Sequence, residues 1–96
     1  MSNKIPDVYP GEILEEEFLK PLGISAYRLA KETKISATRI SQIINGRRRI
    51  TADTALRFGK FFGSSADFWL GLQMVYDLRN EKAEIQCVLE DIKEYK

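Results

Sequence analysis

The chain has 96 residues, of which 44% are hydrophobic and 30% are charged, and its formal net charge is +1. This length suits one domain, spanning residues 1–96, and the composition is that of an ordinary globular protein. Apolar runs are short and residues 1–4 show no signal-peptide pattern, so we expect neither a membrane segment nor secretion. The one cysteine, Cys87, cannot form an internal disulfide, which suits a reducing, cytoplasmic compartment.

Charge is distributed unevenly along the chain. Residues 26–60 carry nine basic and two acidic side chains, a local net charge of +7, whereas residues 1–25 and residues 61–96 each carry −3. The near-neutral total argues against a nucleic-acid partner, but the cationic middle can attract phosphate groups locally. The charge pattern therefore keeps DNA among the expected partners.

The first predicted helix spans residues 10–19. Pro10 suits its first turn, because the amide hydrogen that proline lacks has no partner there in any case. Pro21 and Gly23 are expected to stop the helix. Sustained alternation of apolar and polar residues is missing throughout, so the fold class we predict is all-α.

Two short helices are predicted next, over residues 26–33 and residues 37–44. Ser25 and Ser36 are the expected N-caps, since a serine hydroxyl accepts a hydrogen bond from the first turn of a helix. The residues expected to face inward are Leu29, Ala30, Ile40, Ile43 and Ile44, with Tyr27 as a further candidate.

Asn45 and Gly46 are expected to end the third helix, because both residue types tolerate the left-handed backbone conformation. The fourth predicted helix, residues 52–62, follows Thr51 as its N-cap and ends at Gly63. Its predicted buried face consists of Ala55, Leu56, Phe58 and Phe62.

The fifth predicted helix begins after Ser64 or Ser65 and carries apolar residues at helical spacing. The tail after it is also amphipathic, and the pattern leaves open whether the helix continues or breaks near Asn80. A helix unbroken over residues 66–94 would be about 43 Å long, too long for this small chain to cover by itself. We therefore expect a C-terminal dimerisation helix over about residues 66–94. Its candidate interface residues are Val75, Leu78, Ile85 and Leu89.

The central prediction is a helix-turn-helix unit over residues 26–45. Its two short helices are apolar on the inner face, and the second is polar outside, a combination that lets a helix lie in the major groove of DNA. Gln42 and Thr38 are the expected base readers, since glutamine pairs with the N6 and N7 edge of adenine and threonine bonds or touches thymine. Three arginines follow the helix directly, and we expect at least two of them to contact phosphates.

The complete set of candidate DNA-contacting residues includes several with alternative roles. Arg39 and Ser41 suit a base or a phosphate equally, and Ala37 could touch a thymine methyl. Ser36 is first of all a cap, and C-capping explains Asn45 as well as a phosphate contact does. The set is Ser36, Ala37, Thr38, Arg39, Ser41, Gln42, Asn45, Arg47, Arg48 and Arg49.

Catalytic, cofactor and metal chemistry find no support in the residue pattern. The chain has no histidine, so the acidic run at residues 15–17 is better interpreted as solvated charge than as an acid–base site. Cys87 would need unusual partners to bind zinc, and we interpret it as structural. Trp69 and its aromatic neighbours are expected in the core or a dimer interface rather than in a ligand pocket. We therefore predict no enzyme, no cofactor and no metal site.

Two sets of motifs resemble known families. Leu29-Ala30, Ile35-Ser36 and the run ISQIING at residues 40–46 resemble the phage-repressor and Cro (XRE) class of helix-turn-helix proteins. Three flanking blocks resemble the HigA-type antitoxins, and the resemblance covers about residues 9–80. The blocks are PGEIL at residues 10–14, ITADTALR at residues 50–57, and FWLGLQ at residues 68–73 with Tyr76-Asp77-Leu78.

The chain departs from this class at one position. Members often have glycine at the turn where Lys34 stands here, and a lysine in the left-handed conformation costs about 1 kcal/mol.

The resemblance implies a five-helix, phage-repressor-like domain with a C-terminal helical extension. It also implies a homodimeric repressor that binds double-stranded DNA at a palindromic operator, often its own promoter. A HigB-like toxin that cleaves messenger RNA would be a second partner. Two alternatives remain, a regulator of transcription with no toxin and a protein-interaction adaptor that has lost DNA binding. The polar helix face and the arginine cluster argue against the adaptor, and a neighbouring toxin reading frame would separate the other two.

Overall fold

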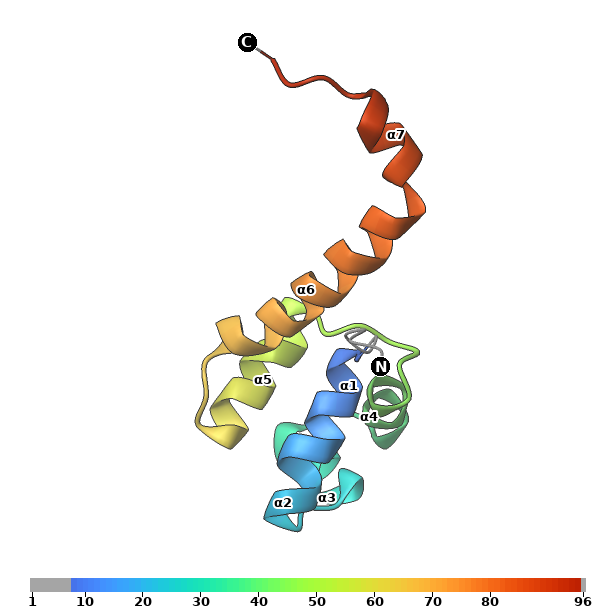
Figure 1. The fold of residues 1–96 in the computed structure, drawn as a ribbon. Coiled ribbons are helices and arrows are strands. Elements are labelled where there is room, and N and C mark those ends of the chain that lie inside the picture. Colours follow the sequence, from blue (N-terminus) through green and yellow to red (C-terminus); the bar gives the residue numbers. More distant parts are fainter. Residues whose placement is uncertain (1–7, 96) are drawn as a thin grey trace.

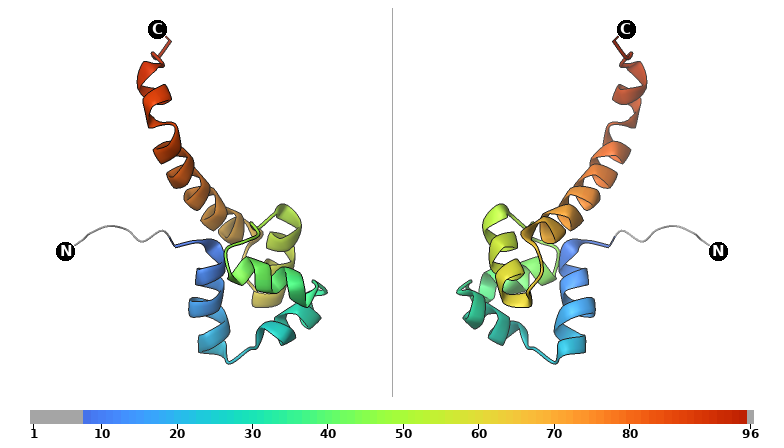
Figure 2. Two further views of the ribbon diagram at one scale, coloured as in Figure 1. Left: turned by 90° about the vertical axis from the view of Figure 1, so that its right-hand side faces the viewer. Right: turned by 90° about the vertical axis from the view of Figure 1, so that its left-hand side faces the viewer.

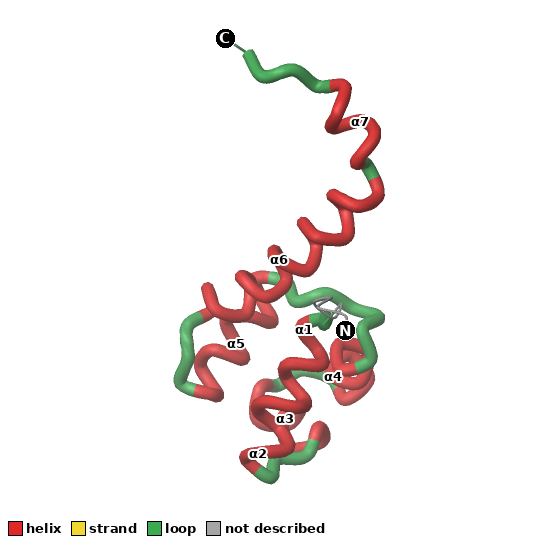
Figure 3. The backbone as a smooth tube through the Cα atoms, viewed as in Figure 1, coloured by secondary structure: helices red, strands yellow, loops and turns green. Residues whose placement is uncertain are grey.

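The computed structural model describes residues 8–95, and this part of the chain contains helices and loops but no strand. Residues 1–4, which show no signal-peptide pattern, lie outside it. Short helices form the body of the molecule, and the long helix α6 extends from it toward the C-terminal end (Figures 1 and 3). Two further views show the same extension from the sides (Figure 2). No helix in the described residues is long and apolar enough to span a membrane.

The N-terminal rod is longer than predicted. It consists of α1 (Pro10–Ile13), a π-helical segment (Leu14–Leu19) and α2 (Lys20–Leu22), which follow one another without a break. The prediction that it ends at residue 19 was wrong, because the chain widens to a π-turn just before Pro21. In that turn the amide of Lys20 donates to the carbonyl of Glu15, and a proline with no amide hydrogen is accommodated next. Gly23, with φ of 67°, ends the rod.

The next three helices have the predicted bounds, which are α3 (Ala26–Thr33), α4 (Ala37–Ile44) and α5 (Ala52–Phe62). Their N-caps are also confirmed, since Ser25, Ser36 and Thr51 each accept a hydrogen bond from the amide three residues later.

Asn45 and Gly46 end α4 as predicted, and of the two only Gly46 takes the left-handed conformation, with φ of 79° against −87° at Asn45. Two smaller predictions about these helices were wrong. Leu56 is 64% exposed and Tyr27 is 70% exposed. On α5 the stripe of residues 55, 58 and 59 faces inward, so the residue after Ala55 is turned away by about 100°.

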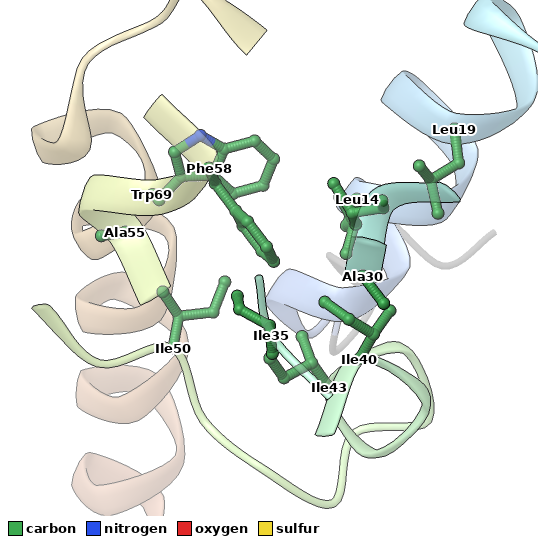
Figure 4. Packing of buried hydrophobic residues seen from close by; sticks show 11 residues of the cluster. Leu14, Leu19, Ala30, Ile35, Ile40, Ile43, Ile50, Ala55, Phe58 and Trp69 are labelled. Atoms are coloured by element: carbon green, nitrogen blue, oxygen red, sulfur yellow. The ribbon is translucent and has the colours of Figure 1, made fainter. Parts of the chain in front are cut away.

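Aromatic and aliphatic side chains from all the longer helices form the core (Figure 4). Phe58 and Trp69 are fully buried with their ring centroids 5.2 Å apart, which fastens α5 to α6. The Trp69 indole N–H donates to the hydroxyl of Ser64, so this polar atom is also satisfied. The buried hydrophobic residues are Leu14, Leu19, Leu29, Ala30, Ile35, Ile40, Ile43, Ile50, Ala55, Phe58 and Trp69.

The C-terminal region consists of α6 (Ala66–Glu84) and α7 (Gln86–Asp91). Ser65 is the N-cap of α6, as one of the two predicted alternatives. The sequence left open whether this helix continues or breaks near Asn80. In the structure it continues past Asn80 and breaks at Ile85, where φ is −110° and ψ is 23°. Cys87 is exposed on α7 and so contributes nothing to the core, which corrects its interpretation as a structural residue.

Candidate nucleic-acid interface

Helix α4 presents a polar face to solvent and an apolar face to the core. Ile40 and Ile43 are almost completely buried, while the side chains on the opposite side are exposed. The residues exposed at the start and along the outer face of this helix are Ser36, Ala37, Thr38 and Ser41. All four are polar or small residues of the predicted contact set, and they lie where the core leaves the helix uncovered.

The turn before α4 contains Lys34 in the left-handed conformation, with φ of 61° and ψ of 37°. It is the one non-glycine residue with positive φ in the described part of the chain. Arg57 of α5 donates from Nη1 to the carbonyl oxygens of Thr33 and Lys34, each at 3.0 Å. This charge-assisted cap stabilises a turn that has no glycine. Sequence reasoning missed the role of Arg57.

The close approach of the N-terminal rod also positions α4. A Cβ added at Gly11 would overlap the carbonyl oxygen of Ile43, so α1 reaches α4 at this point through bare backbone. The ring of Tyr9 lies beside Gly46, where an added Cβ would be 3.2 Å from a ring carbon. Both contacts place the end of α4 against the start of α1 and its N-cap residue, Tyr9.

Gln42 and Arg48 form a pair beside the polar face. Gln42 is half-buried near the end of α4, and its Oε1 accepts a hydrogen bond of 2.9 Å from Nε of Arg48. Residues 47–49, which we call the arginine loop, follow the helix, and all three of its side chains are exposed. Asn45 is exposed as well, and its backbone amide donates to the carbonyl of Ser41.

A buried glutamine fastens the arginine loop to α6. Gln73 is 4% exposed, accepts a hydrogen bond of 2.7 Å from the amide of Ile50, and donates one of 3.0 Å to Asp77. Asp77 in turn pairs with Arg49 at 2.6 Å. Arg49 was predicted as a phosphate contact, and its carboxylate partner competes with that role. The sequence did contain a signal for this link. Gln73 lies four residues after Trp69, on the same buried face of the helix, and a glutamine there needs a hydrogen-bond partner.

Arg39 reaches from α4 to the start of α5. Its Nη2 donates to the hydroxyl of Thr54 at 2.6 Å and lies 3.2 Å from a carboxylate oxygen of Asp53. The other carboxylate oxygen of Asp53 accepts a hydrogen bond of 2.8 Å from Nε of Arg57. Hydrogen bonds from Arg57 and then from Arg39 hold the pKa of Asp53 below its usual value. We call these three residues, Arg39, Asp53 and Arg57, the Asp53 clamp.

The surface of α6 and α7 carries the predicted dimer residues. Val75, Leu78 and Leu89 are exposed, and Ile85 is partly buried at the break between the helices. Further large apolar side chains exposed on these two helices are Phe68, Leu70, Met74 and Val88.

A cavity of about 280 Å³ lies between the arginine loop, the start of α1 and α6. Its wall combines the loop arginines with Tyr9, Tyr76 and Gln73. No cluster of three or more potential metal ligands occurs within residues 8–95.

Comparison with known proteins gives consistent matches. The helix-turn-helix family matches residues 16–69. The chain is 48% identical to virulence-associated protein I of Dichelobacter nodosus over 90% of this chain and 80% of that one. It is 34% identical to antitoxin HigA-1 of Vibrio cholerae, covering 79% and 71% of the two chains. The solved structure of Pseudomonas aeruginosa antitoxin HigA with the higBA promoter superposes with a TM-score of 0.89 at 37% identity, covering 95% of this chain and all of that one.

The expected fold and family are therefore confirmed. The match covers more than half of the chain, and the structural likeness extends over both the helix-turn-helix unit and the C-terminal helices. The chain belongs to the helix-turn-helix family, in the group that contains the HigA antitoxins.

Proposed function

We propose that this protein is a sequence-specific DNA-binding repressor that reads the major groove with α4. One observation carries the proposal, namely the exposed polar face of α4 directly beside an exposed loop of three arginines. Thr38 lies on that face and Gln42 at its edge, while the arginine loop lies at the end of the helix. The related HigA antitoxin of Pseudomonas aeruginosa has a solved structure that contains a promoter.

Phosphate contacts and base contacts would have different roles in this binding. The arginines neutralise phosphates and release bound counterions, which makes the affinity depend on salt and carries no sequence information. Thr38 and Gln42 reach the base edges and discriminate among them, at about 1–3 kcal/mol for each well-matched pair. Arg48 supports this second role, because its hydrogen bond to Oε1 fixes the orientation of the Gln42 amide.

Specificity requires two copies of the protein. The eight residues of α4 can read a few base pairs at most, and a two-fold dimer on a palindromic operator doubles the length of the site. The exposed apolar side chains of α6 and α7, including Val75, Leu78 and Leu89, offer a surface for the second copy. Ile85, at the break between the two helices, is the fourth interface residue of this proposal.

Repression of its own operon and neutralisation of a HigB-like toxin are the finer parts of the proposal. They are supported by the likeness to two HigA antitoxins, from Vibrio cholerae and Pseudomonas aeruginosa. On this view the chain acts in the cytoplasm as one non-enzymatic domain with no cofactor. A regulator without a toxin is the second candidate, favoured by the similarity to an uncharacterized HTH-type transcriptional regulator of Escherichia coli, at 39% identity over 72% of this chain.

The proposed function is tested by titrating the protein against DNA from upstream of its own coding region and against scrambled DNA, at two salt concentrations. We expect tighter binding to the upstream fragment and a loss of affinity with salt on both fragments. Equal and weak binding to both fragments at both concentrations would contradict an autoregulatory role. A separate experiment distinguishes an antitoxin from a regulator without a toxin. An antitoxin should co-purify with the product of an adjacent small reading frame.

A further inference from the structure

Arg39 is held differently from the arginines of the loop. Its side chain is 28% exposed and bonds to two groups of α5, the Thr54 hydroxyl and the Asp53 carboxylate. Thr54 is itself completely buried, so one end of this contact is part of the protein interior. Arg47 is exposed on the loop, where its charge meets solvent. The guanidinium of Arg39 is therefore bound to α5, although its backbone belongs to α4, the helix proposed to face DNA.

A phosphate bound at Nη2 of Arg39 would displace both of these contacts, because this one atom makes them. The hydroxyl of Thr54 would lose a charge-assisted donor at 2.6 Å, and the carboxylate of Asp53 would lose one of its two arginine partners. With only Arg57 left as its partner, the Asp53 carboxylate would be less neutralised and would repel a nearby phosphate more strongly. A contact from Nη2 to DNA would therefore have to replace two hydrogen bonds already made within the protein, so the contact to α5 competes directly with a contact to DNA.

Asp53 is shared between the two halves of the helix-turn-helix unit. One carboxylate oxygen pairs with Arg39 of α4 and the other with Arg57, whose guanidinium caps the carbonyls of Thr33 and Lys34 at the turn. A single side chain of α5 is thus linked to the end of α3, to the turn and to the first turn of α4. Since α4 has only eight residues, its direction depends strongly on such links.

We propose that Arg39 is a positioning residue rather than a DNA contact, and that with Asp53 it sets the direction from which Thr38 and Gln42 meet the bases. This inference rests on the proposed function and replaces one of the roles that the sequence suggested for Arg39. Arg39 occupies the third position of α4, immediately after Thr38, so a shift of this turn moves the base reader directly. Loss of the clamp should therefore lower discrimination between operator and other DNA, while the number of phosphates contacted stays the same.

The test compares Arg39→Ala with Arg47→Ala, a matched removal of one arginine from the exposed loop. Affinities for the upstream fragment and for scrambled DNA are measured over a series of salt concentrations, and the folded fraction is followed by circular dichroism. For Arg39→Ala we expect an unchanged slope of log affinity against log salt, and an upstream-to-scrambled affinity ratio about tenfold lower, the order of magnitude of one base contact. For Arg47→Ala we expect the slope to fall by about 0.9 with the ratio little changed.

A second pair of variants shows whether Arg39 acts through Asp53. Asp53→Asn keeps the shape of the side chain but removes its charge, and we expect it to lower the affinity ratio as Arg39→Ala does. The double variant should lose less than the sum of the two single variants, because both substitutions remove the contact between Arg39 and Asp53. A loss of folded protein alone would reduce binding to both fragments equally and leave the ratio intact, which is not the expected result.

The outcomes separate this inference from the proposed function. If wild-type protein prefers the upstream fragment but Arg39→Ala reduces the salt slope by about 0.9, Arg39 contacts a phosphate and the inference is wrong while the proposed function stands. An unchanged affinity ratio in Arg39→Ala overturns the inference in the same way. If wild-type protein shows no preference and no salt dependence, the proposed function fails and the inference fails with it.

Discussion

The guanidinium of Arg57 donates a hydrogen bond of 3.0 Å to the carbonyl oxygen of Lys34, the residue that holds a left-handed conformation at the turn of the helix-turn-helix unit. This contact explains how the turn tolerates a lysine. The backbone strain of about 1 kcal/mol at Lys34 is offset by hydrogen bonds from a charged donor, which contribute about 1.5–3 kcal/mol each.

Substitutions of Arg57 and Lys34 test this account of the turn. Arg57→Ala should lower the free energy of unfolding by about 1–2 kcal/mol after allowance for the partial exposure of its side chain. Lys34→Gly should raise it by about 1 kcal/mol, because glycine adopts the conformation without strain. Urea denaturation of the two single variants and the double variant measures these changes. A Lys34→Gly protein less stable than wild type would refute the account of the turn.

Two glycines provide a matched test of helix packing. Gly11→Ala should destabilise the protein by about 1–3 kcal/mol, since the new methyl group overlaps the carbonyl of Ile43 and pushes α1 from α4. Gly71→Ala, within α6, meets nothing within 4 Å and should stabilise the protein by about 0.5–1 kcal/mol through helix propensity. Thermal and urea denaturation measure both changes. Equal effects of the two substitutions would contradict the close approach of α1 to α4.

Stability should depend on pH through Asp53. Because its pKa in the folded protein is lowered by Arg57 and Arg39, the stabilisation is fully present above the unfolded pKa of about 3.9 and disappears as the pH falls through the lower folded value. Between pH 5 and pH 2 the melting temperature of wild-type protein should therefore fall more steeply than that of Asp53→Asn. Parallel curves for the two proteins would show that the clamp does not stabilise the charged carboxylate.

The dimer surface can be tested by adding a charge. Leu78 is 63% exposed on α6, and Leu78→Asp should give a monomer by sedimentation without loss of helix content. Operator affinity should drop by about two orders of magnitude, because a linked second half-site adds 10²–10⁴-fold to binding. Leu22→Asp, at a similarly exposed leucine (58%) of α2, is the control and should remain dimeric. A Leu78→Asp protein that stays dimeric would place the interface elsewhere.

The helices between residues 26 and 62 could be predicted from the sequence because their caps and apolar spacing agree. Ser25, Ser36 and Thr51 mark their starts, and Gly46 and Gly63, both with positive φ, mark the ends of α4 and α5. The N-terminal rod was predicted too short because Pro21 normally stops a helix, and a π-turn that absorbs a proline has no evident sequence signal.

The candidate site could be predicted only in part, for a physical reason. The polar face of α4 follows from helical periodicity, which is local. The contacts of Arg39, Arg49 and Arg57 depend on partners 14, 28 and up to 24 residues away, and a charge pattern does not identify such partners. The same basic residues that indicated DNA thus include several whose present contacts are to the protein itself.

The most direct test of the account is the response of base discrimination to loss of the two proposed readers. The double substitution of Thr38 and Gln42 by alanine is compared with wild type on the upstream fragment and on a panel of its single base-pair substitutions. We expect discrimination to disappear at one or two positions in each half-site, with the preference at other positions and the salt slope retained. Unchanged discrimination at every position would show that α4 does not read the bases through these residues.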